Sequence, residues 1–134
     1  MKRLWKRGPH IAVPDAELAV LKVLWENGPA TIRAITEILY PGGDVSHYAT
    51  VQKLLERLQG RRCVARRAQG RAHLYSATVQ REDLIRERLR DAADKLCEGS
   101  LSPLLTQLVD ARNLSQDEIR TLRQLIENLS DEED

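Results

Sequence analysis

Two runs of helix-breaking residues limit the first half of the chain to short helices. Asn27-Gly28-Pro29 and Tyr40-Pro41-Gly42-Gly43 each stop a helix, because proline has no amide hydrogen to donate and glycine readily adopts the left-handed conformation of a helix end. Apolar residues at helical spacing precede each run, after N-caps predicted at Asp15 and Thr31. We therefore predict one short helix before each breaker, after a basic arm at residues 1–12.

A third helix is predicted from His47 to Arg61, with Ser46 as its N-cap. Its apolar residues recur at the i, i+3, i+4 and i+7 positions of one narrow stripe: Val51, Leu54, Leu55 and Leu58. The remaining faces of this helix are polar and carry basic residues. An amphipathic, basic third helix after two short ones is typical of a helix-turn-helix.

The segment after the third helix has the pattern of a β-hairpin. Two short stretches, 63–68 and 71–77, flank Gln69-Gly70, which predicts the turn. Aromatic residues make up only 4% of the chain and Phe is absent, so the core must consist of Leu, Ile, Val and Ala, which favours helices. The sequence therefore predicts a mainly α-helical protein with a winged helix-turn-helix, three helices plus a hairpin wing, over residues 13–78.

Residues 79–130 are predicted to form further helices, the last of which begins at the capping box Ser115-Gln116-Asp117-Glu118. Short amphipathic helices in so small a region cannot easily make a core of their own. We therefore predict a dimerisation domain that buries its stripes on a second copy of the chain; packing back onto the first half is the alternative. The predicted dimer residues are Ile85, Leu89, Ala92, Leu96, Leu101, Leu104, Leu105, Leu108, Ile119, Leu122, Leu125, Ile126 and Leu129.

Charge divides along the chain although the total is only +1. Residues 1–78 hold 13 Lys and Arg against 6 Asp and Glu, a net charge of +7, whereas residues 79–134 hold 8 against 14, a net charge of −6. Six arginines lie between Arg57 and Arg71 with no acid among them. A basic first half indicates a polyanionic partner; ordinary surface charge that happens to segregate is the alternative.

Several classes of protein are disfavoured by the sequence. No apolar run reaches the roughly 18–20 residues that span a bilayer, so we expect a cytoplasmic protein without membrane insertion. Cys63 and Cys97 form no CxxC motif, which predicts no metal site, and no cofactor is expected. The chain has no glycine-rich phosphate loop, no HExxH motif and no credible nucleophile and base pair, so we do not expect an enzyme.

Four stretches carry a resemblance to a known family: Pro14-Asp15-Ala16-Glu17-Leu18 with Val23-Leu24-Trp25, Ala49-Thr50-Val51-Gln52-Lys53-Leu54-Leu55-Glu56-Arg57-Leu58, Gly70-Arg71-Ala72-His73-Leu74-Tyr75, and Leu114-Ser115-Gln116-Asp117-Glu118-Ile119. In this order and spacing the chain resembles the BlaI/MecI/CopY family of bacterial repressors, the penicillinase repressor family, over about residues 13–129. The resemblance implies an N-terminal winged helix, a helical dimerisation region, and repression by a homodimer on a palindromic operator.

Position on the third helix, together with the match to the family motif, assigns the DNA-binding residues. They are Ser46, His47, Tyr48, Ala49, Thr50, Gln52, Lys53 and Arg57 on the helix and Arg66, Arg67 and Arg71 on the wing. Gln52 can pair with adenine, and Lys53 can reach guanine or a phosphate. Thr50 is equally well explained by a hydroxyl bonded back to its own helix, and Arg57 by solvation. A winged-helix module that binds proteins without reading DNA is the alternative function.

The chain departs from the family at three places. The recognition helix of the family usually ends in Lys-Gly, whereas Arg61-Arg62 stands here and Gly60 comes earlier, which predicts a rearranged helix end. Members that regulate β-lactamase are cut by a membrane sensor metalloprotease at an Asn-Phe bond, where this chain has Asp91-Ala92; such a protease stays only an alternative partner. The acidic tail, residues 131–134, replaces the cysteine-rich motif of copper-responsive members, which disfavours release by metal.

Overall fold

The computed structural model describes residues 12–110 and 114–133. Trp5 and the arm predicted at residues 1–12 lie outside the described residues, apart from Ala12. Contacts divide the chain into two compact units, whose described residues are 12–88 and 89–110 with 114–133. The division falls within one helix, α4 (Arg81–Leu96).

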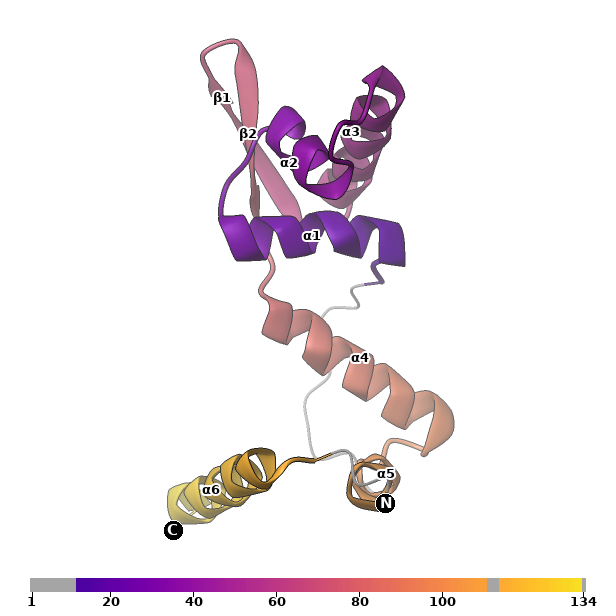
Figure 1. Ribbon diagram of the computed structural model, residues 1–134. Coiled ribbons are helices and arrows are strands. Elements are labelled where there is room, and N and C mark those ends of the chain that lie inside the picture. The colour runs from indigo at the N-terminus through magenta and orange to yellow at the C-terminus, as the bar shows by residue number, and fades with distance from the viewer. Residues whose placement is uncertain (1–11, 111–113, 134) are drawn as a thin grey trace. The chain divides into compact units, whose positions relative to one another are not determined.

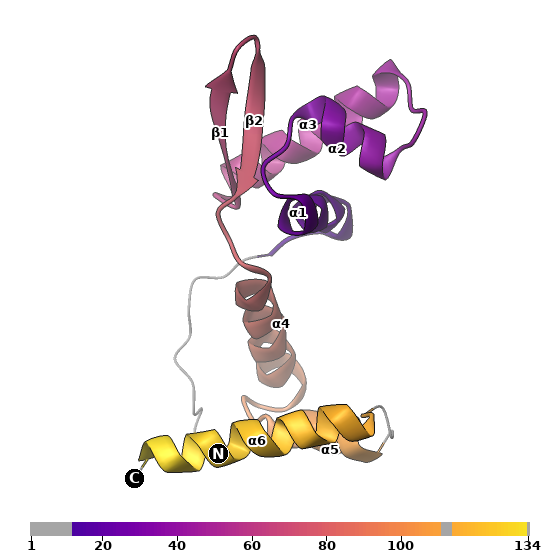
Figure 2. The same ribbon diagram turned by 60° about the vertical axis from the view of Figure 1, so that its left-hand side comes forward.

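The first unit is a winged helix-turn-helix, which confirms the predicted fold class (Figure 1). Its elements are α1 (Asp15–Asn27), α2 (Ile32–Leu39), α3 (Val45–Gly60), β1 (Val64–Gln69) and β2 (Ala72–Ala77). Helix α1 packs against α2, α3 and β2, while β1 lies against α3. Figure 2 shows the same unit from another side, with the hairpin standing on one side of α1 together with α2 and α3.

The hairpin is antiparallel and ends in a two-residue loop. Gln69 pairs with Ala72, so the loop is Gly70-Arg71 and not the predicted Gln69-Gly70. Gly70 has a φ of 62°, a left-handed value that suits glycine at the first position of such a loop, and this shifts the turn by one residue. At the other end, Tyr75 also exchanges two backbone hydrogen bonds with Ala30, of 2.9 and 2.8 Å, which fix the chain between α1 and α2 to the wing.

The core of this unit is aliphatic, as the composition predicted. Its fully buried side chains come from all three helices and from the start of the hairpin: Val20, Leu21, Ile35, Val51, Leu55, Leu58 and Cys63. The first turns of α4 also belong to it, because Leu84 is buried in the same cluster. The indole Nε1 of Trp25 donates to the Val79 carbonyl at 2.9 Å and so holds the segment before α4 against α1.

The helix starts confirm the caps predicted at Thr31 and Ser115 and correct the one predicted at Asp15. Thr31 caps α2, since its side-chain oxygen accepts from the Ala34 amide at 3.2 Å. Ser115 and Glu118 form the reciprocal capping box at 3.0 and 3.1 Å. Asp15 is not an N-cap: the extended residue before α1 is Pro14, and Asp15 is the first helical residue. An acid within the first turn still favours the helix through the partial positive charge of its amino end.

The second unit holds the rest of α4 together with α5 (Ser102–Asp110) and α6 (Gln116–Glu133). Among the described side chains of α5 and α6, none is buried. No helix in the described ranges is long and apolar enough to cross a membrane. This unit therefore consists of amphipathic helices whose apolar stripes the single chain leaves partly or largely open.

Candidate nucleic-acid interface

Helix α3 begins at a cap two residues earlier than predicted. The Asp44 carboxylate accepts from the amides of Ser46 and His47 at 3.0 and 3.4 Å, and the Asp44 amide donates to Nδ1 of His47 at 3.2 Å. Ser46 is thus not the cap; its hydroxyl donates to the Asp44 carboxylate at 2.7 Å. These bonds hold the pKa of the Asp44 carboxyl below its ordinary value, and the bond from the Ser46 hydroxyl contributes most to this lowering. A carboxylate that accepts three bonds is a stronger cap than a serine hydroxyl.

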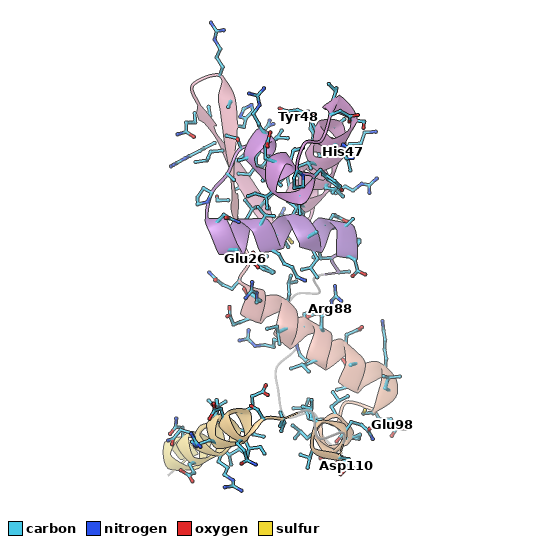
Figure 3. All side chains as sticks on the ribbon, in the orientation of Figure 1. Glu26, His47, Tyr48, Arg88, Glu98 and Asp110 are labelled. Carbon is cyan, nitrogen blue, oxygen red and sulfur yellow. The ribbon has the colours of Figure 1, made fainter. Side chains whose placement is uncertain are left out.

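One side of α3 is buried and the other is open. Val51, Leu54, Leu55 and Leu58 form the buried stripe, while Tyr48, Ala49, Gln52 and Lys53 are exposed on the face predicted to read bases. Figure 3 shows Tyr48 and His47 on the same side of α1 as the hairpin, with Glu26 on the opposite side. The His47 ring also lies 4.6 Å from the Tyr40 ring, which fixes the first turn of α3 to the end of α2.

Thr50 and Arg57 were each open to two interpretations. The Thr50 hydroxyl donates to the Ser46 carbonyl at 3.0 Å, so the back-bonded state is the one observed, with the residue still exposed. The Arg57 side chain is exposed and forms no ion pair within the described part of the chain. A cation in this state is available to an external anion.

The wing presents Arg66, Arg67 and Arg71 in exposed positions. Across the described ranges, none of the three pairs with a carboxylate. Arg66 stands opposite Tyr75 and Arg67 opposite Leu74, so the two neighbours project from opposite faces of the hairpin. They therefore cannot both meet the same stretch of a polyanion, whereas Arg71 lies in the loop at the wing tip.

Arg61 differs from the other arginines of this run. Its Nε donates to Oε1 of Glu17 at 2.9 Å and its Nη1 donates to the Ala12 carbonyl at 2.6 Å. Glu17 is only 1% exposed, so it is a buried acid that needs this partner. The pair ties the end of α3 to the start of α1, which gives the Ala16-Glu17 part of the family motif a structural role.

At the end of α3, the residue with the left-handed backbone conformation is Arg62 and not Gly60. Arg62 has a φ of 63°; its amide donates to Gln59 and the Cys63 amide donates to Leu58, at 3.0 and 2.9 Å. These two bonds form the motif that normally ends a helix with glycine. The expected rearrangement is therefore wrong, because the bonds and the Thr78 hydroxyl, 2.7 Å from the Arg62 carbonyl, fix the turn at this residue.

Sequence reasoning missed two exposed residues of this face. Val45 is the first residue of α3 and is 85% exposed, but it was overlooked because the predicted helix began at His47. Arg33 is exposed on α2 and lines a hollow together with Tyr48 and Arg71. It was overlooked because α2 was interpreted through its apolar side alone; its basic side chain on the opposite side was the available signal.

The predicted dimer residues are all incompletely buried. Eight are exposed: Ile85, Leu89, Leu96, Leu105, Leu108, Leu125, Ile126 and Leu129. Five are half-buried: Ala92, Leu101, Leu104, Ile119 and Leu122. Val109, which the prediction omitted, is 61% exposed on α5. The positions matching the cleaved bond of some relatives, Asp91-Ala92, lie within α4, where Asp91 pairs with Lys95 at 3.1 Å.

A three-helix unit with an exposed basic third helix and an arginine-bearing wing is typical of winged-helix transcriptional regulators. The sequence model of the penicillinase repressor family matches residues 13–128, and the chain belongs to this family. The family consists of transcriptional repressors, which are not enzymes.

Three named relatives agree with this assignment. The chain is 26% identical to the penicillinase repressor of Bacillus licheniformis, over 91% of this chain and 93% of that protein. It is 32% identical to the transcriptional regulator BlaI of Mycobacterium tuberculosis, over 86% and 83% of the two chains. It is 25% identical to the methicillin resistance regulatory protein MecI of Staphylococcus aureus, over 85% and 92%.

Proposed function

We propose that this protein is a dimeric repressor that binds a palindromic operator with α3 in the major groove and the wing on the DNA backbone. The observation that carries the proposal is the contrast among the basic side chains of the first unit. Arg61 is held by a buried carboxylate, whereas Lys53, Arg57 and Arg71 are exposed and have no acidic partner in the described residues. Solvated cations gathered beside an open helix face are what a phosphate backbone attracts.

The first exposed turns of α3 would read the base edges. Gln52 has the amide geometry to pair with adenine through two hydrogen bonds, and Lys53 can reach guanine or a phosphate. Ala49 and the methyl group of Thr50 offer apolar contacts to thymine methyl groups, since the hydroxyl of Thr50 already faces the Ser46 carbonyl. Ser46, His47 and Tyr48 stand at the amino end of the helix, where contacts to the backbone orient the reader.

The dimer would form through the second unit. We propose that residues 13–78 bind DNA and that residues 79–130 bury their open stripes on a second copy, which covers side chains such as Leu125 and Leu129. Half-sites would then lie about one helical turn, or a multiple of it, apart. The net charge of −6 over residues 79–134 would keep the dimerisation region away from phosphates, and the dimer would act in the cytoplasm, beside the chromosome.

We propose that the repressor is released from DNA by a signal other than cleavage at Asp91-Ala92. The bond that matches the cleaved position of some relatives lies within helix α4 and is flanked by the ion pair between Asp91 and Lys95. A protease that requires an extended substrate would first have to unwind this helix. The signal that releases the protein from DNA would therefore act at a place other than Asp91-Ala92.

The test compares wild type with Gln52→Ala/Lys53→Ala on a duplex from the region upstream of its own gene and on a scrambled duplex. Each lost base contact should cost about 1–3 kcal/mol on the cognate duplex and little on the scrambled one. With about 6–10 phosphate contacts per dimer, wild-type affinity should fall by roughly 10³–10⁵ between 50 and 200 mM salt. Lys22→Ala, an exposed lysine on α1, is the matched control and should bind as wild type.

Two results would contradict the proposal. Equal affinity of wild type for the two duplexes would favour a winged-helix module that binds proteins. A sedimentation profile of a single subunit at micromolar concentration would remove the dimer and, with it, the reason for a palindrome.

A further inference from the structure

A hollow of about 410 Å³ opens between α2, α3 and the wing. Arg33 of α2, Tyr48 of α3, and Arg71 and His73 of the hairpin line it. Helix α2 contacts both α3 and β2 in this unit, so all four residues belong to one packed body (Figures 1 and 2). Helix α2 and the wing thus each bring an arginine, Arg33 and Arg71, to one concave site, and α3 adds Tyr48.

The lining of this hollow contains no acid among the described residues. A neighbouring hollow of about 460 Å³ shares Arg33 and Tyr48 but also includes Glu37 and Asp44, which disfavour an anion there. Arg33, Arg71 and His73 form no ion pair with a described carboxylate. The field in the first hollow therefore favours an anion, with two guanidinium groups available from two different elements.

We propose that this hollow holds a backbone phosphate of duplex DNA, gripped by Arg33 from α2 and by Arg71 from the wing. The inference rests on the proposed function and adds to it a contact site between the reading helix and the wing. Tyr48 belongs both to the exposed face of α3 and to the hollow, so the phosphate held there lies next to the bases that α3 reads. Guanidinium groups match phosphate oxygens bidentately, which suits arginine better than lysine for such a grip.

The test measures affinity and its salt dependence for Arg33→Ala on the upstream duplex and on the scrambled one. Affinity falls with salt by a slope of about −0.9 per phosphate contact in a log–log plot, so a dimer that loses two contacts should bind about 30-fold more weakly at ~0.15 M salt. The slope itself should shrink by about 1.8. Both duplexes should weaken alike, since a backbone contact carries no sequence information.

Three further variants keep the test decisive. Arg33→Lys retains the charge but not the bidentate geometry, so it should restore the salt slope and only part of the affinity, and Lys22→Ala should bind as wild type. Arg33→Ala combined with Arg71→Ala should cost less than the two single changes together if both grip one phosphate. Thermal unfolding of Arg33→Ala should match wild type, because the side chain is exposed and unpaired within the described residues.

The outcomes separate this inference from the proposed function. Wild-type affinity and slope in Arg33→Ala, with the cognate preference intact, would overturn the phosphate site and leave the repressor proposal standing. A loss on the cognate duplex alone would show a base contact and would also overturn the site. Failure of wild type to bind any duplex would refute both proposals together.

Discussion

Replacing Arg62 by glycine should stabilise the protein, although the change removes a large side chain. Arg62 has a φ of 63° at the end of α3, a conformation in which the Cβ atom of an L-residue crowds the following carbonyl oxygen. The Arg62 side chain is exposed. The hydrogen bonds that Arg62 makes in the described structure involve only its backbone amide and carbonyl. Glycine keeps the backbone bonds and removes the crowding.

The size of the effect follows from two opposing terms. Relief of the left-handed strain gains about 1–2 kcal/mol, and the greater freedom of glycine in the unfolded chain costs about 0.4–1 kcal/mol. The two ranges give a net stabilisation of about 0–1.6 kcal/mol, centred near 0.8 kcal/mol. Gly60 is the complementary case: it is helical, an added Cβ would meet nothing within 4 Å, and Gly60→Ala should gain about 0.5–1 kcal/mol.

Urea unfolding followed by far-ultraviolet circular dichroism measures both effects. With a urea dependence of about 1–3 kcal/mol per molar for a small protein, each substitution should raise the midpoint by roughly 0.5 M. Arg62→Ala is the control for loss of the arginine side chain and should not raise it, because alanine pays the same left-handed cost. A midpoint for Arg62→Gly at or below that of Arg62→Ala would refute the strain argument.

Three other perturbations test the remaining features. Arg61→Ala should lower the free energy of unfolding in urea by about 2 kcal/mol. This loss is smaller than for a fully buried ion pair because 39% of the Arg61 side chain is exposed. Adding Glu17→Gln to the Arg61→Ala variant should recover part of the lost stability, because no unpaired charge then stays buried. Folding lowers the pKa of the Asp44 carboxyl, so the ionised Asp44 stabilises the folded state. This stabilisation should be complete above pH 3.8 and should fade as the pH falls further. The difference in urea midpoint between wild type and Asp44→Ala should therefore shrink in acid. Leu125→Asp should yield single subunits in sedimentation and weaken operator binding, whereas Gln124→Asp, on a neighbouring exposed position, should do neither.

The order and type of the elements in the first unit could be predicted from the sequence because breakers and periodicity act locally. Helices end at Gly28-Pro29 and Pro41-Gly42 whatever surrounds these residues. The apolar stripe from Val51 to Leu58 is the only side of its helix that can face the core. Cap positions were less predictable. Asp44 and Ser46 are both good caps by residue type, and only the backbone geometry of the loop decides which one meets the free amides.

The role of an individual charge was the least predictable feature. Arg61 and Arg57 stand four residues apart in one basic run, and no local pattern distinguishes them. Their difference arises from Glu17, which lies 44 positions from Arg61 and needs a partner because it is buried. The basic side chain of Arg33 was visible on the polar side of α2, but its grouping with Arg71 and His73 was not, since those residues come from a segment distant in sequence. Contacts of long sequence separation therefore decided which cations stay available.

Helix α3 is held from outside at both of its ends, and this has a consequence for recognition. At the start, the Asp44 carboxylate and the ring contact between His47 and Tyr40 fix the first turn. At the end, the Arg61–Glu17 pair and the Thr78 hydroxyl on the Arg62 carbonyl fix the last one. None of these bonds uses the exposed side chains of Ala49, Gln52 and Lys53. Under the proposed function, these residues therefore sit on a helix that is already ordered before DNA binds. Affinity is then limited by the contacts themselves and not by the cost of shaping the reader.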